Sequence, residues 1–287
     1  MATAWLLCAC FFWAISFIAT KVVLEVVPPL SVVTLRLVIS AACFAPWLIY
    51  KRVRPRPRDI RQLFLLSLLG TGLHYLLQTI GLQYTTASNA SLYAVTGPIS
   101  ILLISAVLLR ERISLRKAAG ITVALVGVLT VLGLETLRSV DFASHLWGDF
   151  LIFTSIFMWG AFTVYGKKLS RSMGAAELVG TATVIGALWM IPVGAWEMHQ
   201  KSFSLAMVTP QAWGAIIFLG VTCSFLATLL WFLALARTES QKVGVYLYTV
   251  PPMTYIAASI ILDERVGLNL LAGSVLVIAG VYLTERG

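Results

Sequence analysis

Ten long apolar stretches constrain the fold of this chain more than any other feature of its sequence. Each is close to the roughly 20 residues that a helix needs to cross the hydrocarbon core of a bilayer. None shows the period-2 alternation that is typical of membrane β-strands. The stretches cover residues 5–24, 31–50, 62–82, 87–109, 118–134, 148–166, 175–196, 212–236, 243–262 and 267–284. The sequence therefore predicts an all-α membrane protein with ten transmembrane helices.

The composition excludes the soluble alternatives. Of the 287 residues, 59% are hydrophobic and 11% are charged, whereas a soluble domain carries about 25% charged residues. This excludes a cytosolic enzyme, a secreted disulfide-bonded module and a disordered chain. The four cysteines all lie inside apolar stretches and lack metal-ligand spacing, so we interpret them as small hydrophobic residues.

The positive charges are concentrated on one side of the predicted membrane. The net charge is +9, and sixteen lysines and arginines lie in the even-numbered connections or at the C-terminus, against three in the opposite connections. By the positive-inside rule, the even-numbered connections and both termini are cytoplasmic. This placement indicates the lipid bilayer rather than nucleic acid as the partner. A secondary contact of the basic segment 51–61 with anionic lipids stays open.

The two halves of the chain repeat the same motifs. Because five helices per half is an odd number, corresponding helices must cross the membrane in opposite directions, as in the inverted repeats of secondary transporters. We predict a first repeat over residues 1–137, an extracytoplasmic linker over 138–147 and a second repeat over 148–287. A shift of 153 residues pairs Pro98, Arg110-Glu111-Arg112, Gly120 and Gly127 with Pro251, Asp263-Glu264-Arg265, Gly273 and Gly280, and a shift of 146 pairs Trp13 and Lys21 with Trp159 and Lys167.

These motifs carry a resemblance to a known family. The ten spans, the five-helix repeat and the Pro…Glu-Arg…Gly…Gly block resemble the EamA family of the drug/metabolite transporter superfamily over essentially the whole chain. Within that family, the chain is most similar to bacterial amino-acid and metabolite exporters, including those for aromatic amino acids. The resemblance implies a multi-pass protein of the bacterial inner membrane. It also implies a central cavity lined by spans 1, 3, 4, 6, 8 and 9.

Polar residues inside the spans are candidates for a substrate site. Thr71, His74 and Gln78 share one helix face, and Tyr75 adjoins them. A polar stripe inside a membrane faces a cavity or another helix, and interhelical hydrogen bonds are the alternative. No Asp or Glu lies in the middle of a span, so a midplane carboxylate is not expected to couple transport to protons. Because histidine titrates near neutral pH in water, coupling through His74 remains an alternative.

Aromatic residues deep in the spans form the second group of candidates. An aromatic wall with a few neutral hydrogen-bonding groups suits amphiphilic, zwitterionic or neutral solutes, whereas core packing is the alternative for each ring. The complete predicted substrate site consists of Trp13, Thr71, His74, Tyr75, Gln78, Tyr93, Trp159, Trp231, Tyr246 and Tyr248.

Prolines recur at matched positions of the fourth helix of each half. Pro98 and the pair Pro251 and Pro252 each remove a helical hydrogen bond. They are predicted hinges, with a static kink as the alternative. The paired glycines of each fifth helix indicate close helix packing, either within the chain or in a homodimer.

Two cations lie within or at the end of a span. Lys21 ends the first span and can extend to the interface, and Arg36 is expected either to pair with Glu25 or to cap backbone carbonyls. We interpret Lys21 and Arg36 as structural or gate residues rather than substrate ligands. The absence of clustered midplane cations argues against a phosphorylated substrate.

The sequence thus predicts an exporter of amino acids or similar small amphiphilic metabolites, working by alternating access and facilitated diffusion. The first alternative is a proton-coupled drug or metabolite antiporter that uses His74. Alternatives from other classes are an intramembrane lipid-modifying enzyme and a structural or sensory membrane protein. The enzyme would need grouped His, Asp, Glu or Cys side chains, which the sequence lacks. We expect no catalytic residue, no metal and no cofactor.

Overall fold

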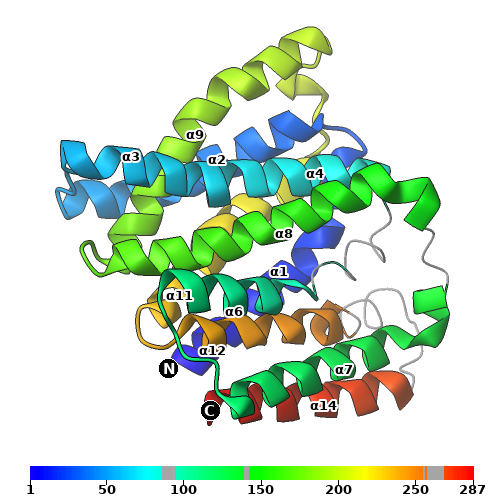
Figure 1. Ribbon diagram of the computed structural model, residues 1–287. Coiled ribbons are helices and arrows are strands. Elements are labelled where there is room, and N and C mark those ends of the chain that lie inside the picture. The colour runs from blue at the N-terminus through cyan, green and yellow to red at the C-terminus, as the bar shows by residue number, and fades with distance from the viewer. Residues whose placement is uncertain (86–92, 94, 139–141, 255, 257–267) are drawn as a thin grey trace.

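The computed structural model describes residues 1–85, 93, 95–138, 142–254, 256 and 268–287, and every regular element in these ranges is helical (Figure 1). Several helical stretches of the described chain are long and apolar enough to cross a membrane. These stretches are Ala2–Leu24, Pro29–Tyr50, Asp59–Tyr84, Leu146–Ser170, Ala175–Gln200, Pro210–Leu235 and Leu268–Glu285. The protein is therefore an all-helical, multi-pass membrane protein.

The first half of the chain builds its third helix from three segments. Its elements are α1 (Ala2–Leu24), α2 (Pro29–Tyr50), the continuous helix α3 (Pro57–Leu66), η1 (Ser67–Leu73) and α4 (His74–Tyr84), then α6 (Gly97–Leu108) and α7 (Leu115–Arg138). Much of the predicted span 87–109 is seen as α6, and residues 87–92 and 94 lie outside the described residues.

The second half follows the same order. Its elements are α8 (Phe142–Ser170), α9 (Ala175–Gln200), the short η2 (Leu205–Met207), the continuous helix α10 (Pro210–Phe218), η3 (Leu219–Ala227) and α11 (Thr228–Leu235), then α12 (Ser240–Gly244), η4 (Val245–Thr249) and α14 (Leu268–Glu285). Helix α8 begins at Phe142, so most of the segment 138–147 that the sequence predicts as a linker is helical. The predicted span 243–262 is described as far as residue 254, and also at residue 256.

Local chemistry fixes where several helices begin. Proline occupies the first turn of α2, α3 and α10, where its missing N–H group would have no helical partner. The Thr209 hydroxyl caps α10 by accepting a hydrogen bond from the Ala212 N–H at 3.2 Å. The Glu197 carboxylate of α9 accepts hydrogen bonds from the N–H and the hydroxyl of Ser31 at 2.8 and 2.9 Å. This places a negative charge at the N-terminus of α2, where the helix dipole favours it.

The third helix of each half changes to π-helical geometry at a similar position. The π-helix η1 follows the ten residues of α3, and the π-helix η3 follows the nine residues of α10. Such segments are rare and are frequent at functional sites. Each one rotates the helix that follows it relative to a continuous α-helix, and thereby sets which side chains of α4 and α11 face inward.

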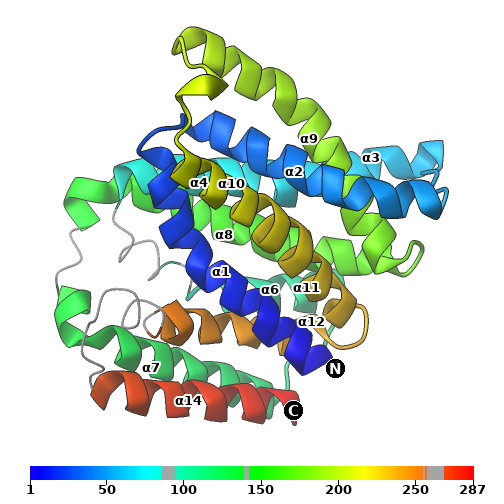
Figure 2. The same cartoon turned by 180° about the vertical axis from the view of Figure 1, so that it is seen from behind.

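Helices of the two halves pack against each other in equivalent pairs, the first helix of one half against the third of the other, and the second, fourth and fifth helices each against their counterparts. Helix α1 packs against α10, η3 and α11, and α8 packs against η1 and α4. Second helices pack together as α2 with α9, fourth as α6 with α12, and fifth as α7 with α14. The pair α7 and α14 lies side by side in both views, and both chain termini lie at one end of the molecule (Figures 1 and 2).

The repeated glycines serve the contact between α7 and α14. A Cβ atom on Gly127 would lie 2.8 Å from the carbonyl oxygen of Gly273, and one on Gly280 would lie 2.5 Å from that of Gly120. The close packing that the sequence indicates is therefore made within the chain. Because the glycine faces of α7 and α14 are buried against each other, they are not available for a contact between two copies of the protein. A homodimer remains a prediction and would need another surface.

Candidate functional site

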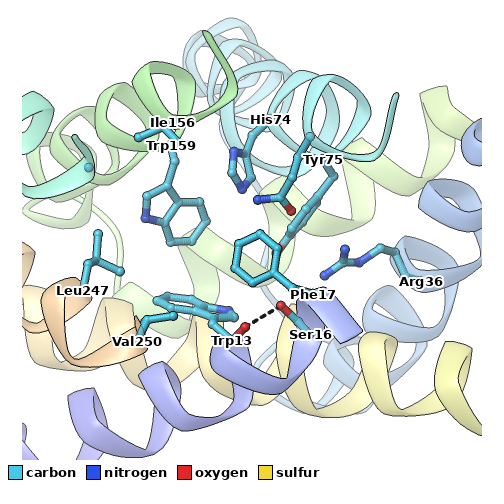
Figure 3. Close-up of a pocket in the computed structure, with 12 residues that line it drawn as sticks. Trp13, Ser16, Phe17, Arg36, His74, Tyr75, Ile156, Trp159, Leu247 and Val250 are labelled. Carbon is cyan, nitrogen blue, oxygen red and sulfur yellow. Dashed lines mark hydrogen bonds between the residues drawn. The ribbon is translucent and has the colours of Figure 1, made fainter. Parts of the chain in front are cut away.

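A cavity lies among side chains from both halves of the chain (Figure 3). About 90 Å³ of it is open to the centres of water molecules, several times the ~10–15 Å³ that one water needs. The lining residues described are Trp13, Ser16, Phe17, Arg36, His74, Tyr75, Gln78, Gly97, Ile156, Trp159, Leu247 and Val250. They include aromatic rings, one cation and neutral polar groups, and no Asp or Glu belongs to this set.

Three tryptophans, one from each of three helices, pack at one side of the cavity. The ring centroid of Trp13 lies 5.0 Å from that of Trp159 and 5.2 Å from that of Trp231. The Trp13 indole N–H donates to the carbonyl oxygen of Cys223 at 3.2 Å, and the Trp231 indole N–H donates to the Thr163 hydroxyl at 3.3 Å. Because the indole N–H groups of Trp13 and Trp231 have hydrogen-bond partners, these two rings are held in fixed orientations.

The polar patch of the cavity centres on His74, the first residue of α4 after η1. The Nδ1 atom of His74 lies 2.8 Å from the carbonyl oxygen of Ser155. Since a carbonyl can only accept, Nδ1 carries the hydrogen, and Nε2 of neutral His74 is an acceptor. Nε2 makes no hydrogen bond to any described residue, and the imidazole ring packs 5.1 Å from the ring of Trp159. Together with Gln78, it offers neutral polar groups to the cavity.

Arg36 enters the cavity from α2. Its side chain is 2% exposed, its Nε donates to the hydroxyl of Ser224 at 2.9 Å, and its guanidinium carbon lies 3.9 Å from the ring centroid of Tyr75. The expected partners are not found. Glu25 is exposed at the end of α1, none of the ion pairs within the described ranges involves Arg36, and its hydrogen bond goes to a side chain rather than to a backbone carbonyl.

The structure brings together half of the predicted substrate-site residues. Trp13, His74, Tyr75, Gln78 and Trp159 line the cavity. The other five do not line it in the described part of the chain. Thr71 donates a hydrogen bond to the carbonyl oxygen of Ser67, and the ring of Trp231 packs against that of Trp13. The ring of Tyr93 packs on that of Phe153, and the hydroxyl of Tyr246 donates a hydrogen bond to the carboxylate of Glu285. The hydroxyl of Tyr248 is buried without a hydrogen-bond partner among the described residues.

Sequence reasoning missed several lining residues. Ser16 and Phe17 lie one helical turn after Trp13, so the spacing alone could have identified them. Arg36 also lines the cavity, although the sequence favoured a structural or gate role for it. The remaining lining residues are small or aliphatic, and no sequence signal distinguishes them from their neighbours. They are Gly97, Ile156, Leu247 and Val250.

The predicted hinge prolines follow departures from α-helical geometry. Pro98 lies in the first turn of α6, which follows a turn at residues 95–96. Pro251 and Pro252 follow the 3₁₀-helix η4, which ends at Thr249, with the α-helical residue Val250 between them. Their role as hinges stays a prediction. Lys21 is exposed in the last turn of α1, and its role as a gate residue also stays a prediction.

A polar network joins the two halves beside the chain termini. The Glu111 carboxylate accepts hydrogen bonds from Lys167 Nζ at 2.8 Å and from the Ser240 N–H at 3.0 Å. Arg110, which precedes Glu111 after the end of α6, adopts φ 56°, a left-handed conformation that is common directly after a helix end. Burial alone would raise the pKa of the Glu111 carboxyl, but the hydrogen bonds from Lys167 and Ser240 and the charge of Lys167 outweigh it and lower the pKa.

A bundle of membrane-spanning helices with a cavity shared by its two halves is the arrangement expected of a secondary transporter. The comparisons with known proteins agree. The chain belongs to the EamA-like transporter family, which matches residues 1–133 and 146–286. It is accordingly a transporter and not an enzyme, which excludes the lipid-modifying alternative.

The relatives cover most of the chain. Two uncharacterized transporters of Archaeoglobus fulgidus are 30% and 28% identical, over 95% and 96% of this chain and 93% and 95% of their own length. A probable terminal-alkyne amino-acid exporter of Streptantibioticus cattleyicolor is 28% identical over 81% of this chain and 75% of its own. A protein of known crystal structure, 20% identical, superimposes with a TM-score of 0.81 over 99% of this chain and 98% of its own, and supports the fold alone.

Proposed function

We propose that the protein exports amino acids or similar small amphiphilic metabolites through the cavity described above. The observation that carries the proposal is the composition of the cavity wall, which combines tryptophan rings, neutral polar groups and the guanidinium of Arg36, while no described lining residue is acidic. The aromatic rings of such a wall can stack on the apolar part of a solute, while its polar groups form hydrogen bonds with a polar group of the same solute. The relative from Streptantibioticus cattleyicolor, a probable amino-acid exporter, supports this substrate class.

The proposed mechanism is alternating access between two five-helix repeats of opposite orientation, residues 1–137 and 148–287, with ten membrane spans in total. Two separate matches to the same family and the matched helix pairs across the halves support this arrangement. We place the chain in the bacterial inner membrane with both termini in the cytoplasm, because the basic connections are those on the side of the termini.

Facilitated diffusion is the proposed energetics, since no described residue of the cavity is a carboxylate that could exchange a proton for substrate. Because His74 lines the cavity and its Nε2 has no partner among the described residues, proton coupling is the second candidate. His74→Gln keeps a hydrogen-bonding side chain of similar size and removes the titratable imidazole. A pH-dependent transport rate that becomes independent of pH in this variant would favour the proton-coupled antiporter.

The direct test is counterflow of radiolabelled amino acids in proteoliposomes, with and without a proton gradient. Trp159→Ala removes one aromatic wall and is expected to reduce counterflow strongly, whereas Trp159→Phe keeps a ring and is expected to reduce it less. Trp147→Ala is the matched control, because Trp147 lies on the same helix with 61% of its side chain exposed. Absence of counterflow in the wild-type protein for every amino acid tested would refute the proposed function, and an absolute requirement for the gradient would refute facilitated diffusion.

A further inference from the structure

The Arg36 guanidinium is a buried positive charge within a membrane-spanning helix. Arg36 lies in the second turn of α2 and is 2% exposed. An ionised side chain at such a place is costly unless it is paired, faces a water-filled cavity or binds a ligand. The position of Arg36 therefore calls for an anionic or strongly polar partner.

The protein supplies only part of that partner. Nε donates to the Ser224 hydroxyl at 2.9 Å, and the face of the guanidinium rests 3.9 Å from the Tyr75 ring centroid. These two contacts fix the plane of the group. The terminal nitrogens Nη1 and Nη2 make no hydrogen bond to any described residue, and no described carboxylate forms an ion pair with Arg36.

The end of the guanidinium that makes no hydrogen bond to a described residue lies at the cavity. Arg36 is one of its lining residues, and its guanidinium points toward the rings of Phe17 and Tyr75 (Figure 3). Nη1 and Nη2 form the planar fork that binds a carboxylate through two parallel hydrogen bonds. A fork with one edge anchored and the other free is arranged for an anionic group that comes from outside the protein.

We propose that Arg36 binds the carboxylate of the transported solute, an inference that rests on the proposed function and narrows its substrate class. The solute is an organic carboxylate with an apolar or aromatic body, which lies against Phe17, Trp13 and Trp159. Its amino group, where it has one, meets neutral acceptors and aromatic faces, because none of the described lining residues is acidic. The carboxylate is therefore required for binding and the amino group is not.

The same arrangement disfavours cationic amines. In a cavity of low polarity, the fixed charge of Arg36 repels a solute that carries only an ammonium group. A carboxylate neutralises that charge and satisfies the free guanidinium nitrogens at the same time. The site is thus selective between solutes of similar size and shape that differ in charge.

The test compares four probes that share a phenyl ring and differ in their charged groups. These are L-phenylalanine, 3-phenylpropionate, L-phenylalaninamide and phenethylamine. Binding is measured by quenching of tryptophan fluorescence in the detergent-purified full chain, and exchange by counterflow in proteoliposomes. We expect the two carboxylates to bind and exchange, and the amide and the amine to bind at least about 30-fold more weakly, as expected when a buried charge pair loses one partner.

Variants of Arg36 test the residue itself. Arg36→Gln is expected to weaken binding of both carboxylates at least about 30-fold, and Arg36→Lys, which keeps the charge but not the fork, to lie between it and the wild type. Arg237→Gln is the matched control, because the Arg237 guanidinium also stacks on an aromatic ring, that of Trp5 at 4.3 Å, and does not line this cavity. The probe comparison in the wild-type protein is decisive even where an Arg36 variant does not fold.

Three outcomes would overturn the inference. They are equal binding of the amide or the amine and the carboxylates, no binding of either carboxylate, and unchanged carboxylate binding in folded Arg36→Gln. Equal counterflow of the probes with and without a carboxylate would overturn the role of Arg36 and would leave the proposed function unaffected. Binding of carboxylates that depends on Arg36 without any counterflow would support the site and overturn the proposed function instead.

Discussion

The ammonium of Lys167 lies 2.8 Å from the carboxylate of Glu111 and connects the end of α8 to the loop between α6 and α7. Both side chains are mostly buried, with 11% of Glu111 and 13% of Lys167 exposed. The same carboxylate accepts hydrogen bonds from the N–H and the hydroxyl of Ser240, at the start of α12. Three elements from both halves therefore meet at one carboxylate, at the end of the molecule that holds the termini.

Loss of this carboxylate is expected to open the end of the protein that holds the termini. Glu111→Gln removes a charge-assisted contact, so the population of molecules open at that end should rise about tenfold. Cys10 is a native reporter, because its side chain is buried and its Sγ lies 3.3 Å from the Tyr246 carbonyl oxygen. The rate at which a membrane-impermeant thiol reagent modifies Cys10 from the side of the termini measures the opening.

The reporter needs a background in which Cys8, Cys43 and Cys223 are replaced by serine. Lys201→Met serves as the control, since it removes an ion pair with Glu197 in which the lysine is half exposed. This pair lies away from Glu111, so the control should leave the modification rate of Cys10 unchanged. An equal rate in Glu111→Gln and in the background protein would contradict a closing role for Glu111.

The pKa of Glu111 predicts how this contact depends on pH. Its pKa is lowered in the folded protein, so its contribution to stability is complete above the unfolded value of about 4.3. The contribution is lost as the pH falls through the lowered folded pKa. The melting temperature of the wild-type protein should exceed that of Glu111→Gln at pH 7, and the difference should shrink as the pH is lowered below 4. A difference that grows on acidification would refute the assignment.

The helical membrane class could be predicted from the sequence because it depends on length and apolar composition alone. The irregular segments could not. The π-helices η1 and η3 consist mostly of apolar and small residues, and a change of helical period leaves no trace in such a residue pattern. The early start of α8 at Phe142 was missed because segment 142–147 includes polar and interfacial residues.

Residues that line the cavity could be predicted where polarity marks one face of a helix, and their role in binding substrate stays a prediction. His74, Tyr75 and Gln78 stand out because their helix is otherwise apolar, and all three line the cavity. Trp231 and Tyr246 lie in helices that are apolar all round, and hydropathy cannot tell which face of such a helix turns inward. The contact of Arg36 with Ser224 joins residues 188 positions apart, and no local pattern points to it.

The glycine contacts between α7 and α14 predict a strong effect of a single methyl group. In Gly280→Ala, the new Cβ would overlap the backbone nitrogen of Ala124 and would lie 2.5 Å from the carbonyl oxygen of Gly120. Because backbone atoms cannot move aside cheaply, the variant should lose about 1–3 kcal/mol of stability. Gly214→Ala is the matched control, since nothing lies within 4 Å of its Cβ position. Thermal unfolding in detergent should separate the two variants, and equal melting temperatures would refute the packing argument.

Substitution of Trp231 is expected to affect mainly the stability of the protein, and substitution of Trp159 mainly its affinity for substrate. Trp231 is 0% exposed and does not line the described cavity, whereas Trp159 lines it. Trp231→Ala leaves a large internal void and should cost about 3–5 kcal/mol of stability. Trp159→Ala borders a space that already exists, so it should cost less stability but weaken binding of L-phenylalanine about tenfold, because the solute loses an aromatic face. Thermal unfolding and fluorescence titration of both variants test this division, which fails if Trp231→Ala melts near the wild-type temperature while Trp159→Ala binds normally.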